Sequence, residues 1–264
     1  MEELIKYFTE QGVSRGLAIT YIVVSALLVV MAIVALVMRI MVVFKYHKGN
    51  HTKTKSGKTS FQVAEEALSK LGLKDVKVKK AGFFRAFFIG NSYSISQNTI
   101  FLRPSIANKD SITAVSLALQ KVAIAKMHHE GKSSVKIRNT AQVLTLVGPI
   151  LFVPVVLLGF LIDILLFKNF GVFSVVGIAI GLVLVAAGFV QTFLNLPVEK
   201  KANTIALEMI DKTGVLDKSE REIAKKVFDA YIIAYVCEFI VAILRVVQIV
   251  LEIVMNSQIN SKNS

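Results

Sequence analysis

The chain has 264 residues, of which 54% are apolar and 19% are charged, and its formal net charge is +13. A soluble domain usually contains about 45–50% apolar and about 25% charged residues, so this composition is shifted toward a lipid environment. High hydrophobicity together with high charge requires that the two be segregated along the chain, which excludes both a disordered chain and an ordinary soluble enzyme.

Four long apolar runs divide the chain. The first exceeds the roughly 20 residues that cross about 30 Å of hydrocarbon, and we interpret it as an uncleaved membrane anchor. The second and third are separated by only four residues, which predicts a helical hairpin. The expected order begins with an amino-terminal flank (1–16), a first span (17–44) and a cytoplasmic α+β segment (45–141). A two-span hairpin (142–196), a cytoplasmic helical loop (197–229), a fourth span (230–255) and a tail (256–264) follow.

The first cytoplasmic segment carries helix and strand signals. Thr59 can cap a helix, with Gln62 completing a capping box and Gly72 ending the helix. Asp110 or Ser111 can cap a second helix that stops at Gly131. The sequence therefore predicts two helices, at residues 59–72 and 111–129. Between them it predicts three short strands, at residues 76–78, 83–89 and 99–102.

The fourth span carries a charged stripe. Glu238, Arg245 and Glu252 recur every seven residues and therefore lie on one side of a helix. Charges inside a membrane are costly and tend to face protein or water. Asp163 in the second span is a candidate partner for Arg245. Structural pairing between helices is favoured over an ion path.

The lysine and arginine distribution predicts the orientation. Basic residues concentrate in 45–58 and 200–226, and cytoplasmic loops carry such an excess. We therefore expect a multi-pass protein of the cell membrane with both ends outside and with residues 45–141 and 197–229 in the cytoplasm. The lipid bilayer is one expected partner. Nucleic acid is not expected, because the lysines lie against a span and lack interleaved aromatic residues.

Three stretches follow one another in a distinctive order: residues 57–78, the Leu196-Pro197-Val198-Glu199 motif and residues 205–235. In this order they resemble the bacterial membrane neutral zinc metallopeptidase family, the YugP-like proteins, and the match covers about residues 30–255. The resemblance implies a mainly α integral membrane protein with about four transmembrane helices, a small cytoplasmic α+β segment and a zincin-like helix packed near the membrane. It also implies zinc, held by an H-E-V-G-H-A-I-Q motif on the second cytoplasmic helix.

The stretch in register with that motif departs from it at every chemical position. Gln120 replaces the first histidine ligand, Lys121 the glutamate base and Ile124 the second histidine ligand. Glu199 matches the glutamate that the resemblance assigns as the third ligand. The family's D-H-Y-D-P turn before the helix keeps only its tyrosine, Tyr93.

This replacement decides the expected chemistry. A zinc hydrolase needs about three protein ligands and an open position for water, and Glu199 alone cannot supply them. Lys121 is an ammonium at neutral pH, so it cannot accept a proton and would repel a divalent cation. We therefore expect no bound zinc and no catalytic residue at this position. Instead, we expect an ion pair between Lys121 and Glu199 that closes the former cleft.

Three functions follow from these residues. The first is a pseudo-peptidase that binds other membrane proteins or regulates an active relative. The second is a hydrolase that uses other groups, with Ser92, Ser94, His128 and Glu130 as the candidate nucleophiles and bases. The third is a small transporter or lipid-handling protein that uses the charged stripe of the fourth span. The sequence specifies no oligomeric state.

Overall fold

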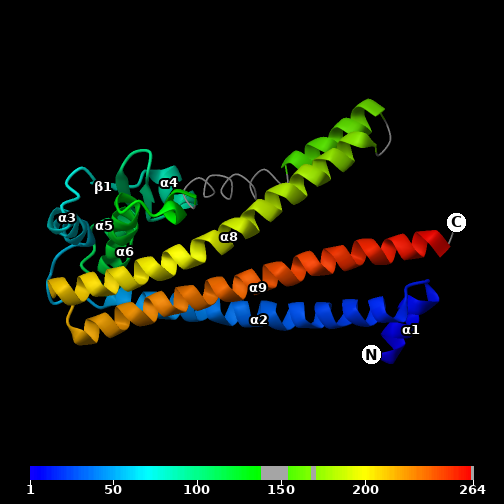
Figure 1. The fold of residues 1–264 in the computed structure, drawn as a ribbon, viewed down its shortest axis with the longest axis horizontal. Helices are drawn as coiled ribbons and strands as arrows, with labels where there is room; N and C mark the ends of the chain where they lie inside the picture. The colour runs from blue at the N-terminus through cyan, green and yellow to red at the C-terminus, as the bar shows by residue number, and fades with distance from the viewer. Residues whose placement is uncertain (138–153, 168–170, 263–264) are drawn as a thin grey trace. The chain divides into compact units, whose positions relative to one another are not determined.

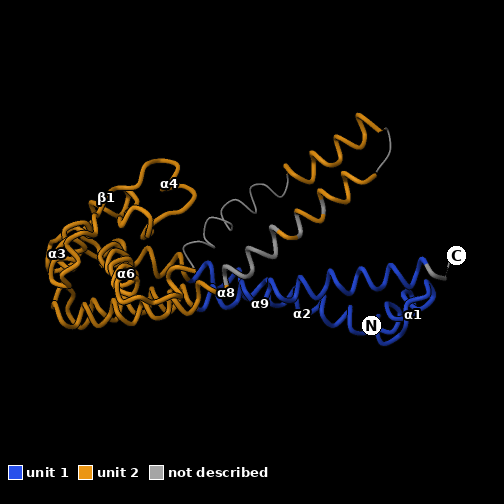
Figure 2. The backbone as a smooth tube through the Cα atoms, turned by 45° about the horizontal axis from the view of Figure 1, so that its top comes forward, with its two compact units in different colours: residues 1–41, 233–264 blue, residues 42–232 orange. Residues whose placement is uncertain are grey.

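The computed structural model describes residues 1–137, 154–167 and 171–262 and is mostly helical with one small sheet (Figure 1). The chain forms two compact units, shown in Figure 2. The first unit contains Met1–Met41 and Ile233–Ser264, and the second contains Val42–Ile232. Two long helices, α2 (Arg15–His51) and α9 (Lys218–Lys262), each contribute residues to both units.

The two long helices are the membrane-spanning candidates of the described ranges. Each is long and apolar enough to cross a bilayer. They contain the first and fourth predicted spans. The prediction of four membrane-spanning helices is not supported, because the described ranges contain two such helices. The second predicted span lies partly outside the described residues, and its described part is the shorter apolar helix Pro154–Phe167. The third predicted span lies in α8 (Val172–Thr213), which continues through Pro197.

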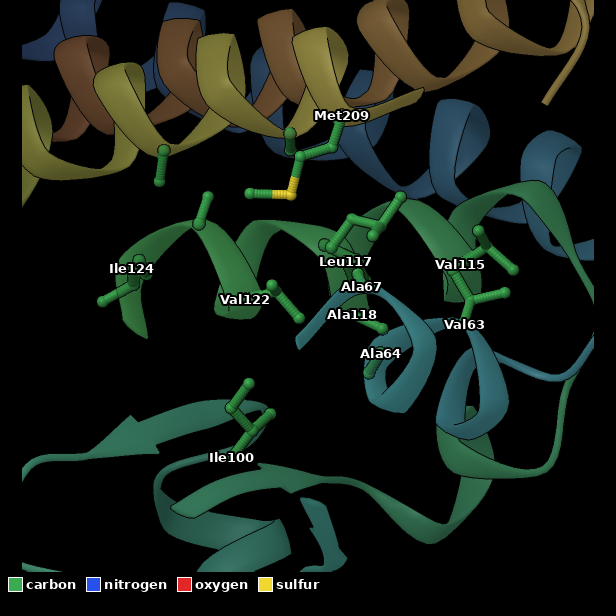
Figure 3. Packing of buried hydrophobic residues seen from close by; sticks show 14 of the residues in the cluster. Val63, Ala64, Ala67, Ile100, Val115, Leu117, Ala118, Val122, Ile124 and Met209 are labelled. Atoms are coloured by element: carbon green, nitrogen blue, oxygen red, sulfur yellow. The ribbon is translucent and has the colours of Figure 1, made fainter. Parts of the chain in front are cut away.

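The second unit is built around α6 (Ile112–His129). Its sheet has the order β1-β3-β2, with β1 (Lys77–Lys80) parallel and β2 (Ser92–Ser94) antiparallel to β3 (Thr99–Leu102). Figure 3 shows α6 between α8 on one side and α3 (Ser60–Lys70) with the sheet on the other. Two further short helices, α4 (Phe83–Phe88) and α5 (Pro104–Ala107), lie in the connections, and α1 (Glu2–Glu10) belongs to the first unit.

The caps place α3 and α6 where the sequence predicted them. The Thr59 side chain accepts from the Gln62 backbone N–H, and the Gln62 side chain accepts from the Thr59 N–H, which confirms the capping box. The Ser111 hydroxyl accepts from the Ala114 N–H. Both helices therefore begin at a side-chain cap, and of the two caps predicted for the second helix the structure has Ser111 and not Asp110.

The predicted strand at 83–89 is wrong, since residues Phe83–Phe88 form α4. Gly82 precedes the helix, and the phenylalanines do not alternate with polar residues as a half-buried strand requires. The third strand of the sheet is instead β2, which is three residues long. A strand this short carries no periodicity by which a sequence pattern can locate it.

Candidate functional site

The site consists of two polar pairs between α6 and α8. The Lys121 Nζ lies 3.5 Å from the Glu199 Oε1, and these side chains are 9% and 8% exposed. One residue earlier on α6, the Gln120 Nε2 donates to the Asn203 Oδ1 at 2.6 Å. The structure therefore confirms the predicted contact between Lys121 and Glu199, and it adds Asn203 to the site.

The local sequence explains why these four side chains meet. Glu199 and Asn203 are four residues apart on α8, so they lie on the same face one turn apart. The α8 residues beside them are apolar and buried: Val198, Ala202 and Ala206. Ile124, one turn after Gln120 on α6, is 1% exposed and belongs to the same apolar core. The polar pairs are therefore buried beside apolar side chains, where electrostatic attraction is stronger than in water.

Comparison with known proteins identifies the family to which the chain belongs. A profile of the family described as "Putative neutral zinc metallopeptidase" matches residues 23–254. The chain belongs to this family. A relative from Bacillus subtilis (strain 168), described as "Putative membrane protease YugP", is 25% identical over 202 residues, which are 75% of this chain and 82% of the relative. No solved structure matches the chain.

The residues of this site do not fit the zinc that the neutral zinc metallopeptidase family implies. Zinc prefers thiolate, imidazole and carboxylate ligands and needs about three of them from a protein. The α6 positions supply an amide, an ammonium and an alkyl chain, and the Lys121 ammonium takes up the space beside the Glu199 carboxylate. Within the described ranges, no three His, Cys, Asp or Glu side chains gather closely enough to hold a metal ion.

A second polar cluster lies at the carboxyl end of α6. The Tyr93 hydroxyl donates to the Asn98 Oδ1 at 2.7 Å, and the His128 Nδ1 lies 3.0 Å from the same hydroxyl oxygen. A hydroxyl has one hydrogen, so we infer that the His128 Nδ1 carries a proton and donates. Burial raises the pKa of Tyr93 to about 12, and Asp75 adds to this. Burial also lowers the pKa of His128, with His129 and Lys136 contributing.

The alternative hydrolase residues are not assembled as nucleophile and base. The Ser92 hydroxyl accepts from the Arg85 Nη2 at 3.3 Å, and the Ser94 hydroxyl lies 3.3 Å from that of Ser96. In the part of the chain that the structure describes, no hydrogen bond joins either serine to His128. Glu130 is paired with Lys126 one turn earlier, at 3.4 Å. A nucleophile needs a base within hydrogen-bond reach, so this geometry does not favour the hydrolase.

The charged stripe of the fourth predicted span faces α2 within the first unit. Glu238 accepts from the Arg39 Nε at 2.7 Å. Glu252 accepts from the Tyr21 hydroxyl at 3.0 Å. These two contacts support the expected structural pairing between helices over an ion path.

The suggested partnership of Asp163 with Arg245 stays a prediction. The Arg245 Nη1 donates to the Gln248 Oε1 at 2.5 Å. The Asp163 carboxylate accepts the backbone N–H groups of Gly171, Phe173 and Ser174, at distances of 2.9, 3.4 and 2.6 Å. These amides form the start of α8, so Asp163 caps that helix.

Proposed function

We propose that this member of the neutral zinc metallopeptidase family does not hydrolyse peptides at the family's site and acts by binding other membrane proteins or regulating an active relative. One observation carries the proposal: Lys121 and Glu199 form a buried ion pair. The resemblance in sequence implies that these two residues stand where the family has its base and its third ligand. A general base must accept a proton from the attacking water, and an ammonium has no lone pair with which to do so.

A groove beside the sheet supports the binding role. It has a volume of about 420 Å³ and is lined by residues of α3 and β1 and of the turn between them. β1 pairs with β3 on one edge, and among the described residues no strand pairs with its other edge. An extended polypeptide can add to such an edge through backbone hydrogen bonds. We propose that an extended segment of a membrane protein binds there.

The catalytic part of the proposal can be tested by hydrolysis of dye-quenched casein by the full chain in detergent with added zinc. We expect no cleavage above that of the Glu199→Ala variant, because the wild-type site has no base and no ligand set. Cleavage that depends on Glu199 and is abolished by a zinc chelator would overturn the proposal. A chelator-insensitive activity that persists in the variant would place any hydrolysis at other residues.

The binding part can be tested by photo-crosslinking in native membranes. Benzoylphenylalanine at Ser69, which lines the groove, should crosslink to membrane proteins, whereas the same group at the exposed Lys225 should not. Equal crosslinking from both positions would show that contact is unspecific and would contradict a binding role for this groove.

We also propose that the hairpin completes a four-span topology with residues 45–141 and 197–229 in the cytoplasm. The described part of the hairpin supports this, because Leu158 and Leu165 are 58% and 71% exposed, and Val172 and Val175 at the start of α8 are 73% and 67% exposed. Aliphatic side chains this exposed on both helices are typical of a lipid-facing surface.

A further inference from the structure

Helix α4 presents four phenylalanines on one face. Phe83, Phe84, Phe87 and Phe88 are 79%, 76%, 69% and 47% exposed. Their spacing places all four within less than half of the helix circumference, because successive residues are about 100° apart. Exposed aromatic side chains of this number in one short helix form an apolar patch, and such a patch marks a surface that contacts a partner or a membrane.

The opposite face of α4 holds the helix on the sheet. The Arg85 guanidinium lies 3.7 Å from the centre of the Phe101 ring on β3 and donates to the Ser92 hydroxyl on β2. Arg85 and Ala86 are half-buried. The charged residue of the helix is therefore turned inward and the four aromatic residues outward, which is the reverse of what a water-facing helix requires.

The surroundings of the patch are basic. Lys79 and Lys80 on β1 are exposed and lie just before α4 in the chain, and residues 76–90 contain no aspartate or glutamate. Lysines next to exposed aromatic residues match the chemistry of an anionic lipid interface, where rings enter the acyl boundary and ammonium groups meet phosphates.

The second unit also begins directly at the end of a membrane-spanning candidate. The last turns of α2 belong to this unit, and the Thr113 hydroxyl of α6 donates to the Tyr46 carbonyl of α2 at 3.1 Å. The chain therefore enters the second unit directly from a helix that is long and apolar enough to span a bilayer. We propose that α4 inserts its phenylalanine face into the headgroup–acyl boundary of the bilayer that the chain spans, with Lys79 and Lys80 on anionic headgroups. This inference does not depend on the proposed function.

Spin-label depth in nanodiscs of anionic lipid tests the proposal. The only cysteine is Cys237, so Cys237→Ser provides a background for Phe87→Cys in the full chain, and Glu65→Cys on an exposed position of α3 is the matched control. We expect the label at position 87 to be more accessible to oxygen than to a soluble nickel chelate. We expect the control to show the opposite preference.

Two results would overturn the proposal. Equal nickel accessibility at positions 87 and 65 would place α4 in water. Protection of position 87 from both reagents, with dipolar broadening between labels, would place a second copy of the chain on the patch.

A second experiment tests the lysines by combining Lys79→Gln with Lys80→Gln. Losing the ammonium groups should move the label at position 87 toward water in anionic but not in neutral nanodiscs. No shift in either lipid would remove the assigned role of the lysines.

Discussion

The Lys121–Glu199 pair illustrates how a buried ion pair contributes to a fold. Burying two charges costs desolvation energy that their attraction offsets only with good geometry, so such a pair adds little net stability. It does specify which faces of α6 and α8 meet, because any other alignment would leave a charge in an apolar interface. The adjacent Gln120–Asn203 hydrogen bond fixes the same alignment.

At this scale we predict strong coupling between the two charged residues. Lys121→Met alone should lower the free energy of unfolding by about 3–5 kcal/mol, because it leaves the buried Glu199 without this cation. Lys121→Met combined with Glu199→Leu should recover most of the loss. Circular dichroism at 222 nm during unfolding in detergent measures both. Additive losses in the double variant would show that the pair is not coupled.

We predict that substitution can create a metal site at the positions in register with the family's motif. Gln120→His, Lys121→Glu and Ile124→His together restore two histidine ligands one turn apart, with Glu199 facing them from α8. We expect this triple variant to bind about one zinc per chain, since three protein ligands suffice, and to lose it on Glu199→Ala. Competition with a chromophoric chelator measures the affinity. Binding that persists after Glu199→Ala would show that Glu199 is not the third ligand.

The sequence predicted part of this site. Lys121 and Glu199 could be paired in advance because the family resemblance supplied the register of both helices. Asn203 was missed, although its spacing of four residues from Glu199 indicated the shared face. The hydrogen bond between Gln120 and Asn203 could not be predicted, because it depends on the distance between α6 and α8. That distance is set by the packing of the whole unit.

Among the short helices of the second unit, the capped helices α3 and α6 were predicted and the uncapped helix α4 was not. α3 and α6 carry side-chain caps, which are local signals. α4 has no side-chain cap, and its aromatic residues favour strands when judged by propensity alone. As a helix, α4 places Arg85 in contact with Phe101 and Ser92. These residues are 16 and 7 positions further along the chain, so a local sequence pattern does not reveal the contacts.

For the hairpin we predict that the Asp163 cap matters. Asp163→Ala removes the acceptor of three backbone N–H groups and should destabilise the chain by about 1–3 kcal/mol, the cost of leaving buried donors unpaired. Asp163→Asn keeps one acceptor oxygen and should therefore destabilise the chain less than Asp163→Ala does. Thermal unfolding in detergent compares the two. Equal losses would indicate that the charge of Asp163, and not its acceptor geometry, stabilises the hairpin.

At the scale of the whole molecule, the apolar runs predicted four spans, and the structure supports the first and the fourth as long apolar helices. These two could be predicted because apolar length is a property of the sequence itself. The hairpin lies partly outside the described residues, so its predicted start at residue 142 is untested. The division into two units, with α2 and α9 contributing to both, was not predicted, since it depends on contacts between residues far apart in the chain.

The predicted orientation has a direct test in the Cys237→Ser background. Lys70→Cys and Glu208→Cys should be protected from a membrane-impermeant maleimide in intact cells and labelled after permeabilisation, because both lie in segments that the positive-inside rule places in the cytoplasm. Glu3→Cys should be labelled in intact cells. The reverse pattern would invert the topology, and labelling of Glu208→Cys alone in intact cells would contradict the membrane-spanning hairpin.

We propose that a zinc metallopeptidase fold persists in this chain without a zinc site. Elemental analysis of the purified full chain, after dialysis against zinc and removal of the free ion, measures whether zinc is bound. We predict far less than stoichiometric zinc, unchanged by Glu199→Ala. About one zinc per chain, as a site with three protein ligands would hold, lost on Glu199→Ala, would contradict the account.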